Sequence, residues 1–127
     1  MLQIYQMIRE DKNEELLLQM INDKRLGIED RNKEGMDPLI LAVDCEFSVD
    51  TLAELVGLGC NVNNQDCIGR TALHYAVDLE NKDIIKFLLS HGADPTIKDS
   101  AGLTPADEMR GDPELEAVLE EATRMKE

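Results

Sequence analysis

The stretch DCIGRTALHYA, residues 66–76, decides the fold, because it joins turn residues directly to a run of apolar, helix-compatible residues. Thr71 is a residue type that caps helices, since its hydroxyl oxygen can accept a hydrogen bond from a backbone N–H two or three positions later. Leu73, Ala76 and Val77 then fall on one face of a helix. The stretch predicts a turn that leads into a short helix with one buried face.

The same pattern recurs along the chain. Gly69 has counterparts at Gly35 and Gly102, which stand 34 residues before it and 33 residues after it. The sequences around these two glycines are NKEGMDPLILAV and SAGLTPADEM. Upstream, LVGLGCNVNNQD and LLSHGADPTIKD, residues 55–66 and 88–99, align without a gap. Self-similarity at this period is typical of stacked structural repeats.

Each repeated unit is predicted to contain two helices. In the middle unit a second apolar stripe precedes Gly92, whose left-handed conformation would stop the helix. In the unit before it, Asp37 is expected to cap a helix that has Pro38 at its first position. One extra residue near Phe47 should lengthen only the turn between the helices. The second stripes are Ile84, Ile85, Leu88 and Leu89 in the middle unit, and Thr51, Leu52, Leu55 and Val56 in the unit before it.

The middle unit resembles the ankyrin-repeat family. It matches the pattern D-x-x-G-x-T-x-L-H-x-A at Asp66, Gly69, Thr71, Leu73, His74 and Ala76. The resemblance implies an all-α ankyrin-repeat solenoid of about four helix-turn-helix units with hairpin-like projecting turns. We expect one domain over residues 1–127. It would comprise an N-terminal capping unit (1–31), two repeats (32–65 and 66–98) and a C-terminal capping unit (99–127).

Three positions depart from the family pattern. Asp37 replaces the threonine and Ile40 the histidine of one unit, while Asp107 stands at the histidine position of the last. In the family this histidine hydrogen-bonds between neighbouring loops. We therefore expect the turns of these two units to lack the usual threonine and histidine hydrogen bonds.

Both ends of the chain have the features of capping units, which make the exposed faces of a stack tolerable to water. Residues 4–10 and 13–21 carry two apolar stripes at helical spacing. Asp112 and Pro113 form a cap and first-position pair for a closing helix. Acidic residues of this helix are expected to solvate its outer face, and the alternative that they dock a basic partner stays open. The apolar stripe of the closing helix is Leu115, Val118, Leu119 and Ala122.

The composition narrows the class of protein. Only 3% of the residues are aromatic and none is Trp, so the core must consist of aliphatic residues and methionine, which favours helices. The formal net charge of -14 opposes binding to nucleic acid or to an anionic membrane. It either favours a partner protein with a basic surface or only keeps a leucine-rich stack in solution. Three cysteines without framework spacing indicate free thiols, and no leader or membrane-spanning stretch is visible. We expect a cytoplasmic chain, with a nuclear location as the alternative.

No set of residues indicates catalysis or a cofactor. Cys67 and His74 could act as nucleophile and base, but no acidic orienting residue or glycine-rich oxyanion turn accompanies them. Cys60, Cys67 and His74, with Cys45 further away, lack the closely paired spacing of structural zinc ligands. The predicted catalytic, cofactor-binding and metal-binding residues are therefore none, and the protein is expected not to be an enzyme.

The family resemblance implies that a partner protein binds across a concave side formed by the projecting turns and the first helices. The function predicted is non-catalytic protein–protein interaction. Met36, Ile68, Leu79 and Leu103 stand out, because they place apolar side chains where the fold should expose them. The predicted partner-binding residues are Lys33, Glu34, Met36, Asp44, Cys45, Cys67, Ile68, Arg70, Asp78, Leu79, Ser100, Ala101 and Leu103.

A narrower resemblance suggests an alternative. NNQDCIGRTALHYAVD and GADPTIKDSAGLTPAD are similar to the ankyrin module that follows an acyl-CoA-binding domain in some lipid-carrier proteins. In that case the chain would be a regulatory module, and acyl-CoA would bind only to a domain outside this chain.

Overall fold

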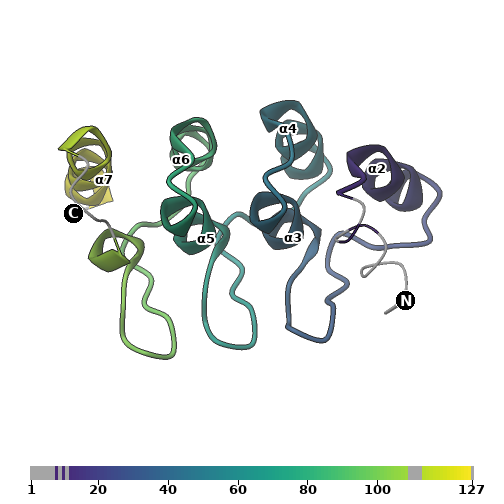
Figure 1. Ribbon diagram of the computed structural model, residues 1–127, viewed down its shortest axis with the longest axis horizontal. Coiled ribbons are helices and arrows are strands. Elements are labelled where there is room, and N and C mark those ends of the chain that lie inside the picture. The colour runs from purple at the N-terminus through teal and green to yellow at the C-terminus, as the bar shows by residue number, and fades with distance from the viewer. Residues whose placement is uncertain (1–7, 9, 11, 109–112, 127) are drawn as a thin grey trace.

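A computed structural model describes residues 8, 10, 12–108 and 113–126. All regular secondary structure assigned within these residues is helical. Two rows of helices run side by side along the long axis (Figure 1). The outer row contains α2 (Glu14–Asn22), α4 (Val49–Gly57), α6 (Lys82–Ser90) and α7 (Pro113–Lys126). The inner row contains α3 (Pro38–Asp44), α5 (Ala72–Asp78) and the short 3-10 helix η1 (Pro105–Glu108). Three long turns project from the inner row, which confirms the all-α class with hairpin-like projections.

The predicted caps set the helix boundaries. The Asp37 carboxylate accepts a hydrogen bond from the Ile40 N–H at 2.8 Å, and Pro38 is the first residue of α3. Thr71 caps α5 in the same way. Gly92 follows the end of α6 with a φ of +91°, a conformation that glycine adopts at little cost. The extra residue of the earlier unit lengthens only the turn between its two helices. This turn spans residues 45–48 after α3, whereas the equivalent turn after α5 spans residues 79–81.

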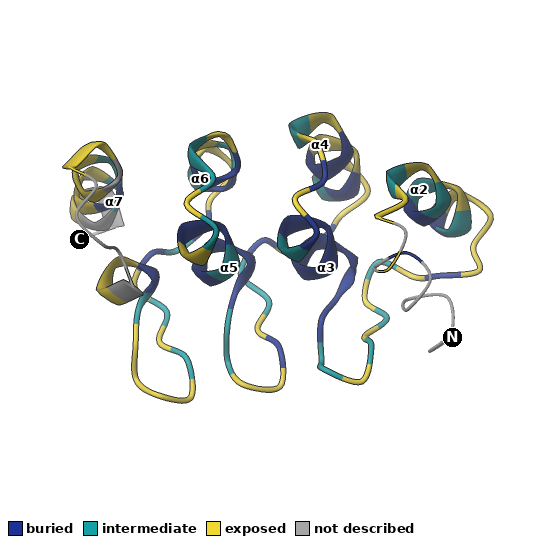
Figure 2. Cartoon of the chain, viewed as in Figure 1, coloured by how far each residue is buried: buried dark blue, intermediate teal, exposed yellow. Residues whose placement is uncertain are grey.

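The hydrophobic core lies between the two rows of helices (Figure 2). Each outer helix contributes a leucine that is at most 1% exposed: Leu17, Leu55, Leu88 and Leu119. The inner helices contribute Ala42 and Ala76, both fully buried. Their small side chains let α3 and α5 approach closely. Removing one of the buried leucines should cost about 2–5 kcal/mol, because a cavity would remain.

The last helix closes the outer row. α7 begins at Pro113 as predicted, and it buries Leu119 against the core. Glu114 pairs with Lys82 at 3.0 Å and with Lys86 at 3.2 Å, which joins α7 to α6. The predicted cap Asp112, the side chain of Leu115 and most of the predicted helix at 4–10 lie outside the described residues.

Candidate functional site

The three projecting turns, called fingers here, comprise residues 32–36, 66–70 and 99–103. In the second finger, the Asp66 carboxylate accepts hydrogen bonds from the N–H groups of Ile68 at 3.0 Å and Arg70 at 2.9 Å. Asn32 and Asp99 make the corresponding contacts in the other two fingers. A glycine with a φ between +78° and +80° completes each turn, where an L side chain would be strained. The finger shape is therefore determined locally.

Neighbouring fingers are joined by a backbone ladder. The Cys67 N–H donates to the Glu34 carbonyl at 3.1 Å, and one unit later the Ser100 N–H donates to the Ile68 carbonyl at 2.9 Å. The residue just before each finger adds a side-chain bridge. Arg31 donates to the Gln65 carbonyl at 2.7 Å, and Gln65 donates in turn to the Lys98 carbonyl at 3.2 Å. These bonds hold the fingers side by side.

Sequence reasoning missed these bridging residues. Arg31, Gln65 and Lys98 stand at equivalent positions, and each carries a long side chain with N–H donors. The repeat alignment shows that these long polar side chains recur at one position, but only the hydrogen-bond distances between fingers show that they bridge neighbouring units.

His74 joins the second unit to the third. Its ring is fully buried, and Nδ1 accepts a hydrogen bond from the Thr71 N–H at 3.1 Å. Nε2 therefore carries the proton and donates to the Leu103 carbonyl at 2.9 Å. Both ring nitrogens are engaged in holding the stack, so His74 is a structural residue and has no free nitrogen to act as a base.

The expectation that Asp37 and Asp107 leave their turns without these hydrogen bonds was wrong, whereas the aliphatic side chain of Ile40 cannot make the histidine hydrogen bond, as expected. Asp37 caps α3 and also accepts a hydrogen bond from the Asn64 side chain at 2.8 Å. Asp107 accepts a hydrogen bond from the Thr104 N–H at 2.9 Å. This N–H, and to a smaller extent the Lys98 charge, lowers the pKa of Asp107. A carboxylate accepts the same backbone donors as a threonine hydroxyl or a neutral histidine nitrogen, which explains why these turns keep their shape.

A polar cluster stiffens the surface of α5 beside the second finger. The Tyr75 hydroxyl donates to the Asp66 carboxylate, and the Arg70 guanidinium lies 4.8 Å from the centre of the Tyr75 ring. Burial and the hydrogen bond to Asp66 raise the pKa of Tyr75, so the phenol stays a neutral donor. Arg70 also donates to the His74 carbonyl at 3.3 Å. This predicted partner-binding side chain is half-buried and held in place.

Two of the predicted exposed positions are buried. Met36 is 4% exposed, because residues 36–43 form an uninterrupted buried segment that leads from the first finger through α3. Cys45 is 6% exposed, because it lies in the core with Phe47 of the longer turn after α3. The prediction that these two side chains face a partner was therefore wrong.

The remaining predicted residues reach the surface to different degrees. Ile68 is 52% exposed and Leu103 is 41% exposed, and Leu58 at 46% is the one other large apolar side chain exposed to this extent among the described residues. Leu79 is half-buried, as are Glu34, Asp44 and Arg70. The exposed members of the predicted set are Lys33, Cys67, Ile68, Asp78, Ser100, Ala101 and Leu103.

Acidic residues gather where the inner helices end. α3 ends at Asp44 and α5 ends at Asp78, and neither helix has a basic residue in its last turn. Glu46 and Glu80 follow in the turns. A negative side chain at a helix C-terminus adds to the negative end of the helix dipole. This edge therefore favours contact with positive charge.

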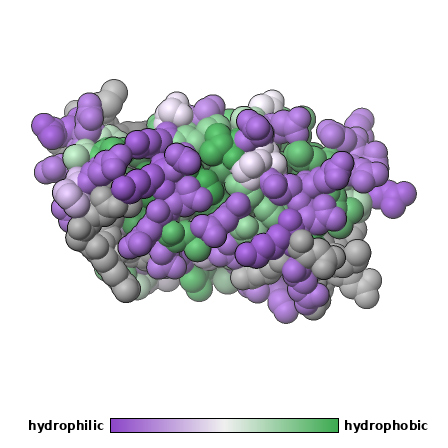
Figure 3. All heavy atoms as spheres, turned by 45° about the horizontal axis from the view of Figure 1, so that its top comes forward, coloured by the Kyte–Doolittle hydropathy of each residue, from purple (hydrophilic) through white to green (hydrophobic). Residues whose placement is uncertain are grey.

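Elsewhere, hydrophilic residues cover most of the visible face in Figure 3, with smaller hydrophobic areas between them.

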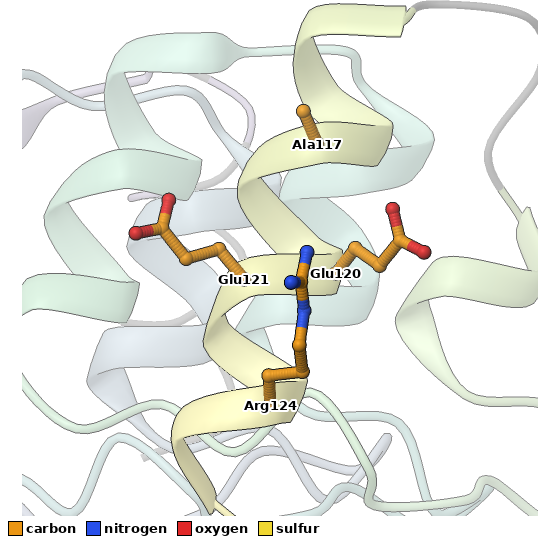
Figure 4. A pocket seen from close by; sticks show the side chains of 4 residues that line it. All are labelled: Ala117, Glu120, Glu121 and Arg124. Carbon is orange, nitrogen blue, oxygen red and sulfur yellow. The ribbon is translucent and has the colours of Figure 1, made fainter.

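The described residues contain no group of three or more His, Cys, Asp or Glu side chains that could hold a metal ion. Burial and the nearby charge of Asp37 raise the pKa of Cys60 to about 12, so its thiol is a poor nucleophile. A pocket on α7 is lined by Ala117, Glu120, Glu121 and Arg124 (Figure 4). All four residues come from a single helix, and the two glutamates point to opposite sides of it. No described helix is long and apolar enough to cross a membrane.

Comparison with known proteins agrees with this architecture. The family model for ankyrin repeats (3 copies) matches residues 4–99, more than half of the chain. The chain therefore belongs to the ankyrin-repeat family, which is a non-enzymatic type of interaction module. The crystal structure of the ankyrin repeat domain of Bcl-3 superimposes with a TM-score of 0.73 and 29% sequence identity. The match covers 81% of this chain and 45% of that one.

Two curated relatives match this chain over a small part of their own length. An ankyrin repeat protein of Acanthamoeba polyphaga mimivirus is 49% identical over 77 residues, or 57% of this chain. The 2-5A-dependent ribonuclease of Homo sapiens is 41% identical over 83 residues, or 65% of this chain. The matched segment is only 10% of the length of each relative. An enzyme name on such a relative therefore describes a protein of which this chain matches a small part.

Proposed function

We propose that this chain is a non-catalytic recognition module that binds a partner protein across its fingers and inner helices. Ankyrin repeats generally mediate protein–protein interaction, which supports the class of function. The observation that carries the proposal is the exposure of Ile68 and Leu103 on adjacent fingers. These two fingers are hydrogen-bonded to each other, so their side chains are presented from one rigid frame.

The size of this patch suits a binding contribution. About half of the Ile68 side chain remains available for burial, and slightly less of Leu103. Covering each with a partner would contribute about 1 kcal/mol, because full burial of such a side chain is worth about 1.5–3 kcal/mol. Cys67, Ser100 and Ala101 are exposed residues of the same two fingers, and their side chains are small enough to leave a partner room to approach.

The charge distribution favours a partner with a basic surface. The chain carries a net charge of -14, and Asp44 and Asp78 stand at the C-terminal ends of the inner helices. Positive side chains of a partner would be attracted to this edge, and the association rate should fall as salt is added. The acyl-CoA alternative stays a prediction, because no observation on the described residues favours it. A cytoplasmic or nuclear location is likewise proposed from the sequence.

The test uses three versions of the chain as bait for affinity capture with quantitative mass spectrometry. They are the wild type, a double variant Ile68→Glu/Leu103→Glu, and the control Leu58→Glu. Leu58 is similarly exposed but caps the outer helix α4. A partner of the proposed surface should be captured by the wild type and the control and lost with the double variant. Its affinity should fall about a hundredfold, since the change removes apolar burial and adds charges that must be desolvated.

The circular dichroism spectra of all three baits must agree, so that lost binding is not lost folding. Equal capture by the double variant and the wild type would contradict the proposed surface.

A further inference from the structure

The third finger is an open edge of the ladder that joins the fingers. The first two fingers each offer one carbonyl, Glu34 and Ile68, to the N–H of the next finger. The equivalent carbonyl of the third finger belongs to Ala101, and it accepts no hydrogen bond from any described residue. A Cβ added at Gly35 or Gly69 would touch the next finger, whereas one added at Gly102 would have nothing within 4 Å.

The side-chain bridge is open at the same place. Arg31 and Gln65 each donate to the backbone carbonyl of the residue just before the following finger. Lys98 stands at the third equivalent position, is exposed, and donates no hydrogen bond to the described part of the chain. The Ala101 carbonyl and the Lys98 ammonium therefore stand at the two positions that, in each of the first two units, bind the segment of the next unit.

The helical rows are closed at this end. A further complete repeat would have to pack its outer helix beside α7, whose exposed residues include Glu116, Glu120 and Glu121. Burying several unpaired carboxylates there would cost several kcal/mol each. The finger edge thus favours an extended segment over another helix pair.

We propose that the third finger binds an extended segment of a partner protein by adding it to the finger ladder. The segment donates a backbone N–H to the Ala101 carbonyl and offers a backbone carbonyl to the Lys98 ammonium. This mode of recognition reads backbone more than side chains, as in other cases of strand addition. It is separate from the apolar patch of the proposed function, because it uses neither Ile68 nor Leu103 side chains.

The chain itself supplies a suitable probe. Residues 96–104 form the segment that pairs with the second finger, donating from the Ser100 N–H and accepting at the Lys98 carbonyl. A synthetic peptide of these residues, cyclised to hold the turn, offers both groups with little loss of conformational freedom. The peptide is titrated into the isotope-labelled full chain, and amide chemical shifts are followed by NMR, which detects weak binding.

We expect saturable shifts centred on Lys98, Ala101 and Gly102. The same peptide with an N-methyl group on its Ser100 nitrogen cannot donate and should bind at least about tenfold more weakly. Lys98→Glu in the protein should weaken binding by a similar factor. Lys33→Glu, which makes the same change on the first finger, should not alter it.

Three results would overturn the proposal: no saturable shifts, equal binding of the methylated peptide, or shifts centred on another surface. A fourth concerns the occupant. Sedimentation of the wild-type chain alone should show a monomer. If the chain self-associates and the amide shifts appear at both the first and the third finger, the occupant of the third finger is a second copy of this chain and not a partner segment.

Discussion

Replacing the finger glycines with alanine should separate two costs that are usually measured together. Gly35 and Gly102 have nearly the same backbone conformation, with φ values of +78° and +80°. Their surroundings differ. An alanine Cβ at position 35 would lie 2.5 Å from the Cys67 nitrogen, whereas at position 102 no atom lies within 4 Å. The pair therefore compares backbone strain alone with backbone strain plus a clash between fingers.

The magnitudes follow from these contacts. A left-handed alanine costs about 1–2 kcal/mol, offset by about 0.4–1 kcal/mol because the unfolded chain loses freedom. Gly102→Ala should therefore lower the free energy of unfolding by about 1 kcal/mol. Gly35→Ala must also push the fingers apart, which lengthens the Cys67–Glu34 hydrogen bond and adds overpacking strain. Its total should reach about 3–4 kcal/mol.

Urea titrations followed by circular dichroism would give both free energies. Gly69→Ala should fall between the other two, because its Cβ would meet the Ser100 nitrogen at 2.9 Å. Gly57→Ala is the control, since Gly57 ends α4 without a positive φ and with nothing within 4 Å, and it should stabilise by about 0.5–1 kcal/mol. Equal losses at positions 35 and 102 would refute the inference that the fingers are in close backbone contact.

Three further predictions concern the buried and exposed polar groups. His74→Ala should lower the free energy of unfolding by about 3 kcal/mol in the same urea assay, because it leaves a cavity and removes the partners of Thr71 and Leu103. The Ser48 N–H lowers the pKa of Glu14 below its usual value of 4.5, despite some opposing burial. The stability difference between wild type and Glu14→Gln should thus be present at neutral pH and disappear as the pH falls through the lowered pKa. A pH-independent difference would contradict this assignment. Of the three thiols, Cys67 alone is exposed and should react with iodoacetamide in the native state, with Cys45 and Cys60 labelled only after unfolding; mass spectrometry of peptides distinguishes the sites.

The sequence by itself determined the repeat and its local geometry. Gly35, Gly69 and Gly102 mark the turns, because glycine adopts a positive φ at little cost and this preference does not depend on neighbouring units. Thr71 and Asp37 mark helix starts for the same reason, since each cap acts over three residues. The regular spacing of these local signals was enough to predict the stacked helix pairs.

Only the tertiary structure decided which side chains are available to a partner. Met36 and Leu103 stand at equivalent positions, yet one is 4% exposed and the other 41% exposed. Likewise, the side chains of Arg31 and Gln65 bond to the segment that leads into the next finger, while no finger among the described residues lies beyond Lys98. Burial and pairing depend on what lies next to a residue in the stack, and two units with the same local sequence pattern can have different neighbours. That is why the amino-acid sequence was enough to predict the fold but not which side chains are exposed to a partner.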